Sequence, residues 1–269
     1  MGMTADVILS ELKYLVDEEK RIVLPKFFKT GIGEYGEGDK FLGVVVPNIR
    51  SVATAHLDIS GKDIAGLLSS PWHEMRMCGL LIMVEHCKQT RKSSWVKLHS
   101  NEEGEQIRKQ NIELYLEHTD RINNWDLVDL SAPTIVGDYL TDKKRDILYH
   151  LAESSLLWEQ RISIVSTYAF IRNNDFDDTY MLAEKLLRHP HDLRGIRHPA
   201  LRARLAAATR RRRRGVGRRG AARPWSIVDT ARAGGRSRRH RRHLTGINVL
   251  LGAAVLAAGD HRRRRDRDG

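Results

Sequence analysis

The segment PWHEMRMCGLLIMVEHC, residues 71–87, decides the fold of this chain. Its proline stands where helices commonly begin, and apolar residues then fall on more than one side of the helix, most densely over residues 80–84. A helix of this kind is stable only when neighbouring elements cover its apolar sides. We therefore predict that residues 71–87 form a helix that is sandwiched between other helices.

Further helices are predicted on both sides of this segment, because apolar residues recur at helical spacing and short polar turns separate the recurrences. They span residues 4–29, a stretch that begins after Pro47, and residues 105–117, 124–140, 142–152, 157–172 and 177–188. Consecutive helices without a credible strand predict an all-α fold. Helix pairs that recur at roughly 40 residues are typical of a HEAT- or armadillo-like α-α superhelical solenoid, which has a concave face.

The glycine-punctuated segment TGIGEYGEGD, residues 30–39, is predicted to be a loop. A phosphate-binding loop needs a lysine followed by Ser or Thr after its last glycine, whereas Asp39, Lys40 and Phe41 follow here, so that nucleotide site is excluded. Residues 41–46 have the composition of a short strand, but no later segment offers them a partner. We expect an extended link into a helix that begins after Pro47.

Charge is divided between two unlike parts of the chain. The formal net charge of +12 and an isoelectric point near 9.9 suggest an anionic partner. However, residues 194–269 hold 23 arginines and four aspartates without lysine or glutamate, which gives +19, and residues 1–193 carry −7. We predict an acidic helical domain over residues 1–193 and a poorly structured tail over residues 194–269. The tail is either the product of a shifted reading frame, which its composition favours, or a basic arm that binds nucleic acid.

Several other classes of protein are disfavoured by the sequence. Cys78 and Cys87 offer no disulfide framework, which suits a reducing compartment, and no Cys/His cluster has the spacing of a zinc site. The N-terminus has no signal-peptide pattern, and the apolar run at residues 244–259 falls short of the roughly 20 residues of a membrane-spanning helix. We expect no metal and no membrane partner, and a location in a bacterial or archaeal cytoplasm, associated with the nucleoid.

Three longer stretches carry a resemblance to a known family. They are TGIGEYGEGDKFLGVVVPNIRSVA (30–53), RINNWDLVDLSAPTIVGDYL (121–140) and LWEQRISIVSTYAFIRNNDFDDT (157–179). In this order and spacing the chain resembles the AlkD-like DNA alkylation-repair family throughout residues 10–193. The resemblance implies a monomeric HEAT-like solenoid that holds duplex DNA on its concave face. It also implies a glycosylase without a cofactor, which hydrolyses the glycosidic bond of N3- and N7-alkylated purines and has no need to flip the base.

The resemblance also implies roles for individual residues. The family's cleft has an Asp four residues after a Trp and an Arg from a later helix, which correspond to Asp129, Trp125 and Arg161. Tyr35, Lys40 and Arg50 are further candidates for contacts with DNA. The family also has a tryptophan in a helix that reads like HKAVGWMLRE after an HDL segment. Here HDL is followed by RGIRHPALRARL, so that tryptophan and the closing repeats are missing.

The chemistry agrees with these residue types. An alkylated N3 or N7 purine is a cation that leaves as a neutral base, so cleavage needs no general acid, and positive charge collects on the sugar. A carboxylate such as Asp129 stabilises that charge and orients the attacking water. Residues i and i+4 share a helix face, so the indole of Trp125 would form a wall beside it, and Arg161 would bind a backbone phosphate.

Other interpretations remain open. Trp125 is alternatively a core residue with Asp129 on a solvated edge, because large aromatic side chains usually serve packing. Asp126, and likewise His73 with Glu74, are interpreted as first-turn residues without a chemical role. At the level of the whole chain, the alternatives to a glycosylase are a non-catalytic HEAT-repeat module that binds DNA structures or protein, and an inactive truncated member of the family.

Overall fold

The structure is a computed structural model in which residues 3–187 are described. Every regular element in that range is helical, and its one β-type contact is an isolated bridge between Lys40 and Trp72. The predicted all-α fold class is therefore confirmed. The extended link is also confirmed, since residues 41–45 are not helical and Pro47 lies in the first turn of the next helix. The predicted tail, residues 194–269, lies outside the described residues.

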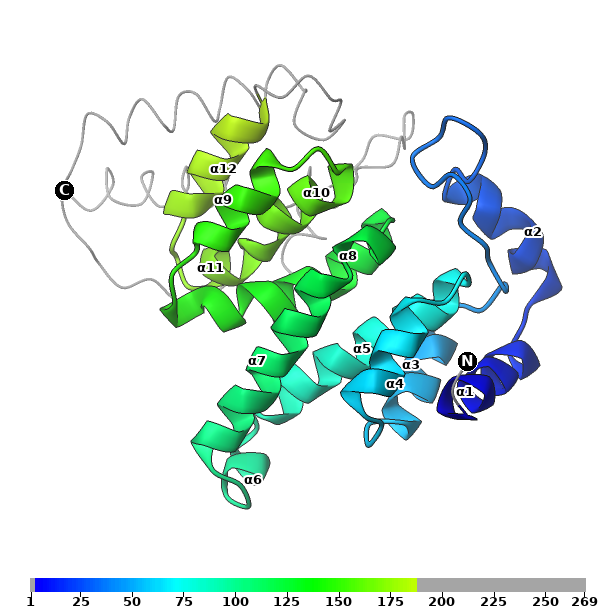
Figure 1. The fold of residues 1–269 in the computed structure, drawn as a ribbon, viewed down its shortest axis with the longest axis horizontal. Coiled ribbons are helices and arrows are strands. Elements are labelled where there is room, and N and C mark those ends of the chain that lie inside the picture. Colours follow the sequence, from blue (N-terminus) through cyan, green and yellow to red (C-terminus); the bar gives the residue numbers. More distant parts are fainter. Residues whose placement is uncertain (1–2, 188–269) are drawn as a thin grey trace, which may run out of the picture. The chain divides into compact units, whose positions relative to one another are not determined.

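The described residues fall into two compact units, which divide between Lys143 and Lys144. The α-helices of the first unit (Figure 1) are α1 (Met3–Tyr14), α2 (Glu18–Phe27), α3 (Val46–Ala55), α4 (Gly61–Leu68), α5 (His73–Gln89), α6 (Ser93–Val96), α7 (Asn101–Glu117) and α8 (Trp125–Ala132). Three short helical turns complete it: η1 (Thr119–Arg121), η2 (Pro133–Gly137) and η3 (Tyr139–Asp142). The described part of the second unit contains α9 (Asp146–Glu153), α10 (Leu157–Ser166), α11 (Tyr168–Arg172) and α12 (Asp177–Leu187).

Helix α5 forms the centre of the first unit. Thirteen of its 17 residues are buried, and it packs against α3 and α4 as well as α7 and α8 (Figure 1). Gly79 permits the close approach of α4, because a Cβ atom there would lie 3.2 Å from the Cβ of Leu67. Each large apolar side chain buried in this way contributes about 1.5–3 kcal/mol. The prediction of a sandwiched helix is confirmed.

The helix predicted over residues 4–29 is instead two helices, α1 and α2. Asp17 separates them, because its side chain accepts a hydrogen bond from the backbone N–H of Lys20 (3.1 Å) and so caps the N-terminus of α2. The backbone N–H of Asp17 also donates to the carbonyl of Gly43 (3.1 Å), which ties the break to the extended link. A capping residue inside an apparently continuous helical pattern therefore starts a second helix.

The helix predicted over residues 124–140 is likewise interrupted. Helix α8 ends at Ala132, and a π-helical turn, η2, follows it. Pro133 explains the change, because it has no N–H to donate to the carbonyl of Asp129 four residues earlier. The N–H of Asp138 instead donates to the carbonyl of Pro133 (2.9 Å) in the wider π pattern.

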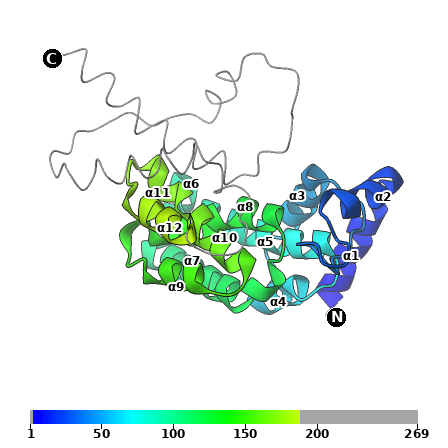
Figure 2. The ribbon, with the colours of Figure 1, turned by 90° about the horizontal axis from the view of Figure 1, so that it is seen from above.

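In the second unit α10 packs against α9 and α12 (Figure 2). The helix predicted over residues 157–172 is divided at Thr167, whose hydroxyl donates to the carbonyl of Ile164 (2.7 Å) and competes with the regular ladder. Arg145 pairs with Asp175 (2.7 Å) and Asp178 (2.5 Å) at the edge of this unit. Among residues 3–187, no helix has the length and apolar character needed to cross a membrane.

Candidate functional site

The start of α8 presents the two residues that the sequence singled out most strongly. The side chain of Asn124 accepts the backbone N–H of Trp125 (2.9 Å), which caps the helix there. Trp125 and Asp129 follow one turn apart on α8, and both side chains are half-buried. The spacing of four residues therefore places an indole and a carboxylate on one helix face with partial access to solvent.

The glycine-rich loop, residues 30–39, lies against this cap. A Cβ atom on Gly36 would stand 3.2 Å from the side-chain nitrogen of Asn124 and only 2.5 Å from the carbonyl oxygen of Phe28. Any residue larger than glycine would therefore clash with the backbone of Phe28 and crowd the side chain of Asn124. The first and second stretches of the family resemblance thus meet in space at the start of α8.

An aromatic cluster surrounds Trp125 and was not recognised in the sequence. The ring of Phe28 stacks on the indole with centroids 5.4 Å apart, and Phe27 approaches it edge-on at 6.1 Å. Phe41 continues the stack beyond Phe28 at 5.0 Å and reaches the ring of His73 at 4.3 Å. Trp125 is thus held by packing on one side. The three phenylalanines that flank the glycine-rich loop were the feature of the sequence that could have indicated this cluster.

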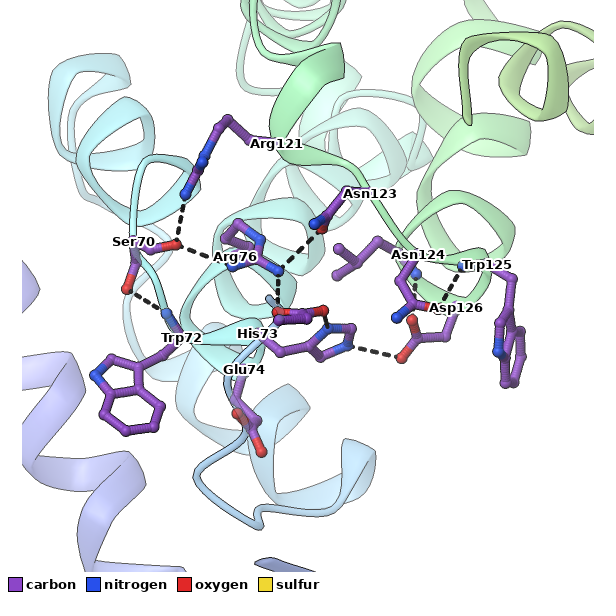
Figure 3. A network of polar contacts seen from close by, with 12 residues as sticks. Ser70, Trp72, His73, Glu74, Arg76, Arg121, Asn123, Asn124, Trp125 and Asp126 are labelled. Atoms are coloured by element: carbon purple, nitrogen blue, oxygen red, sulfur yellow. Dashed lines mark hydrogen bonds and ion pairs between the residues drawn. The ribbon is translucent and has the colours of Figure 1, made fainter. Parts of the chain in front are cut away.

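A buried network of charged side chains, drawn in Figure 3, adjoins the aromatic cluster through His73. His73 contacts Asp39 through Nδ1 (2.8 Å) and Asp126 through Nε2 (2.9 Å). Arg76 donates through Nη2 to Asp39 (2.6 Å) and to the side chain of Asn123 (3.1 Å). The network therefore connects the glycine-rich loop, the first turn of α5 and the first turn of α8.

The two charge types in this network stabilise each other. Burial lowers the pKa of His73, but the carboxylates of Asp126 and Asp39 outweigh it and raise that pKa to about 9. In Asp39, burial raises the pKa, but hydrogen bonds and charge from His73 and Arg76 bring it below its usual value. His73 is thus a cation and Asp39 an anion at neutral pH.

Glu74, at the start of α5, holds the extended link in place. Its carboxylate is 1% exposed and accepts three backbone N–H groups of the extended link, from Leu42 (2.8 Å), Gly43 (2.8 Å) and Val44 (3.1 Å). His73, Glu74 and Asp126 do lie in first turns, as interpreted, but that interpretation missed their buried contacts. Their partners are distant in sequence, so no local pattern marked them.

Comparison with known proteins shows the family of the chain. The family model described as DNA alkylation repair enzyme matches residues 8–196 of the chain. The chain belongs to this family. No curated protein and no solved structure matches the chain. A role in the repair of alkylated DNA follows from membership of this family, with DNA as the substrate.

The other candidate residues of the chain have different surroundings. Tyr35 is partly exposed in the glycine-rich loop, with the ammonium of Lys29 5.8 Å from its ring centroid, and Lys40 is exposed at the end of that loop. Arg50 lies on α3 and pairs with Glu85 of α5 at 3.8 Å. Arg161 belongs to α10 in the second unit, where it is 5% exposed.

No group of three or more His, Cys, Asp or Glu side chains within residues 3–187 has the arrangement of a metal site. Cys78 and Cys87 are free and buried in α5, and burial raises the pKa of each thiol to about 12. Both thiols are therefore neutral packing groups at physiological pH.

Proposed function

We propose that the chain is a DNA glycosylase that hydrolyses the N-glycosidic bond of N3- and N7-alkylated purines in duplex DNA. The observation that carries the proposal is the start of α8, where Trp125 and Asp129 share one face and both keep partial access to solvent. In this proposal the carboxylate of Asp129 stabilises the oxocarbenium ion that forms on the deoxyribose and orients the attacking water. Trp125 provides an apolar wall beside the sugar.

The surroundings of Trp125 support this assignment in two ways. Packing against Phe28 and the cap from Asn124 hold the indole in one orientation, which is what a preorganised site requires. Lys26 and Lys40 are exposed and neighbour, in the sequence, the phenylalanines that contact Trp125. Positive charge is thus present on the segments around the site, although residues 1–193 as a whole carry −7.

The proposal is tested by the release of 7-methylguanine from methylated duplex DNA. Asp129→Asn keeps the shape of the side chain but removes its charge, so release should fall by about a hundredfold or more, while the Kd for duplex DNA should change little. Asp58→Asn is the matched control, since Asp58 is exposed in the loop between α3 and α4 and loses the same charge. Near-normal release by Asp129→Asn would remove Asp129 from the reaction. Duplex binding without base release by the wild-type chain would favour the non-catalytic module instead.

Arg161 is proposed to bind a backbone phosphate. Arg161→Ala should then weaken binding to all duplexes and reduce the slope of log K against log [salt] by about one phosphate contact. Because Arg161 is buried, Arg161→Lys serves as a control that keeps the charge, and the helical content of both variants is compared by circular dichroism. A folded Arg161→Ala variant with an unchanged salt slope would show that Arg161 does not contact DNA.

A further inference from the structure

His73 has an unusual pair of partners for a histidine at the start of a helix. It is 2% exposed, and each ring nitrogen lies within hydrogen-bond distance of a carboxylate from another segment, Asp39 at 2.8 Å and Asp126 at 2.9 Å. A neutral imidazole has one N–H and can donate to only one of them. Both contacts with ionised carboxylates are hydrogen bonds only if the ring carries two protons, so the geometry favours an imidazolium.

The balance of charge leads to the same result. The buried network contains two carboxylates, from Asp39 and Asp126, and one permanent cation, the guanidinium of Arg76. With His73 neutral, the cluster would hold an excess negative charge in a region where all four side chains are less than a tenth exposed. A buried charge without compensation is costly, and a protonated His73 removes it.

Two routes connect His73 to the face of α8 that carries Trp125 and Asp129. The first is ionic: Asp126 directly follows Trp125, and its other carboxylate oxygen accepts the backbone N–H of Leu127 (2.9 Å), so the contact with His73 holds the first turn of α8 (Figure 3). The second is aromatic. The imidazole stacks on Phe41, which stacks on Phe28, which stacks on the indole.

We infer that His73, held as an imidazolium between Asp39 and Asp126, is a positioning residue that fixes the first turn of α8 against the glycine-rich loop and thereby orients Trp125 and Asp129. It does not contact the substrate. Its effect on base release rests on the function proposed above, whereas the positioning itself does not.

The pKa of His73, raised to about 9, supports the inference, because it keeps the proton in place throughout the neutral range. The charged groups that face the ring are Asp39 from the loop and Asp126 from α8, and Arg76 of α5 reaches the ring's environment through Asp39. Deprotonation would cost one of the two hydrogen bonds and leave an excess negative charge in the buried network. The first turn of α8 would then be released from one of its two anchors.

The test is a pH titration of the full chain labelled with 5-fluorotryptophan and followed by ¹⁹F NMR. The chain has five tryptophans, and Trp125→Phe identifies the resonance of Trp125 by its loss. In the wild-type chain this resonance should shift with a midpoint near pH 9. In His73→Gln it should start from a different position and lose that titration. A Trp125 resonance that stays fixed from pH 7 to pH 10, or titrates identically in His73→Gln, would overturn the inference.

A matched control is available elsewhere in the first unit. His56 contacts Glu11 at 2.9 Å between α3 and α1, so His56→Gln removes a comparable histidine–carboxylate pair away from α8. This variant should leave the position and titration of the Trp125 resonance unchanged. A change equal to that of His73→Gln would show that the probe responds to loss of any such pair and would refute the specific role. If His73→Gln fails to fold, Asp126→Asn replaces it, and the wild-type titration still applies.

The activity measurement separates this inference from the proposed function. His73→Gln should lower kcat for 7-methylguanine release by about ten- to a hundredfold, because misplacing a reactive group by about 1 Å has effects of that size, with the Kd for duplex DNA unchanged. An unchanged kcat together with a displaced Trp125 resonance would refute the orientation of Asp129 through His73. If the wild-type chain releases no base, the proposed function fails, and the ¹⁹F titration still decides the positioning.

Discussion

Replacing Glu74 by glutamine tests how the extended link is held against α5. The carboxylate of Glu74 accepts three backbone N–H groups, from Leu42, Gly43 and Val44, at 2.8–3.1 Å, and it is almost fully buried. A glutamine side chain fills nearly the same volume but keeps only one acceptor oxygen. Its NH₂ group would face backbone N–H donors, so the variant loses acceptors without leaving a cavity.

The magnitude follows from these contacts. Hydrogen bonds to a charged group contribute about 1.5–3 kcal/mol each, and each buried N–H group left without an acceptor costs about 1–3 kcal/mol. Glu74→Gln leaves at least one of the three N–H groups unsatisfied and weakens the others. We expect it to lower the free energy of unfolding by about 3–5 kcal/mol. With a urea m-value of about 2 kcal/mol/M, the midpoint should fall by about 2 M.

Two measurements check this expectation. Urea unfolding of the full chain gives the change in stability, and hydrogen exchange followed by NMR gives the local effect, since the amides of Leu42, Gly43 and Val44 should lose protection first. Glu85→Gln is the control on the same helix, because Glu85 contacts only the side chains of Lys88 and Arg50 near the surface and should cost less than about 1 kcal/mol. A Glu74→Gln variant as stable as Glu85→Gln, with its three amides still protected, would refute the reasoning.

Three further predictions concern other parts of the chain. Because the pKa of His73 rises from 6.5 to about 9 on folding, its protonation should contribute about 3 kcal/mol to the free energy of unfolding. This contribution should be complete below pH 6.5 and lost as the pH rises through about 9. Urea unfolding midpoints at pH 6 and pH 9.5 measure the loss, and a loss of equal size in His73→Gln would count against the prediction. Gly43→Ala should lower the free energy of unfolding by about 2–4 kcal/mol, because Gly43 has φ +100° and a Cβ atom would lie 2.7 Å from the backbone nitrogen of Arg21. Gly61 has open space around it, so Gly61→Ala should be nearly neutral in the same urea assay. Residues 194–269 carry +19, so their deletion should sharply reduce binding to undamaged DNA. Circular dichroism should show that the helical content of residues 1–193 is almost unchanged. Unfolding of residues 1–193 after the deletion would contradict the prediction of a separate tail.

The candidate site was predictable only where its residues are close together in the sequence. The family resemblance singled out Trp125 and Asp129, and their spacing of four residues then predicted that both side chains lie on one face of a helix. The partners of His73, by contrast, are 34 and 53 residues away in sequence. The residues next to His73 in the sequence do not show whether its side chain contacts two carboxylates or only stands at the start of a helix. For that reason His73 was assigned no chemical role from the sequence.

The helix boundaries show the same division. Apolar periodicity located most of the helical segments, because the period of 3.6 residues is a property of the backbone, but the short helices α4 and α6 were not among those predicted. The interruptions at Asp17, Pro133 and Thr167 depend on which hydrogen bond prevails when a side chain or a missing N–H competes with the helical ladder. Residues that can interrupt a helix, such as Pro133, are visible in the sequence. Whether the helix is interrupted at such a residue also depends on tertiary contacts, such as the hydrogen bond from the N–H of Asp17 to the carbonyl of Gly43.

By itself, then, the sequence determined the all-α fold, the central helix α5 and the glycine-rich loop, because each depends on the pattern of residues along one segment. Only the tertiary structure decided that Phe28 backs Trp125, that Glu74 holds the extended link and that His73 joins Asp39 to Asp126. These contacts join separate segments. Whether a polar side chain is exposed or buried with a partner depends on how helices pack, and burial is what turns ordinary first-turn residues into a charged network.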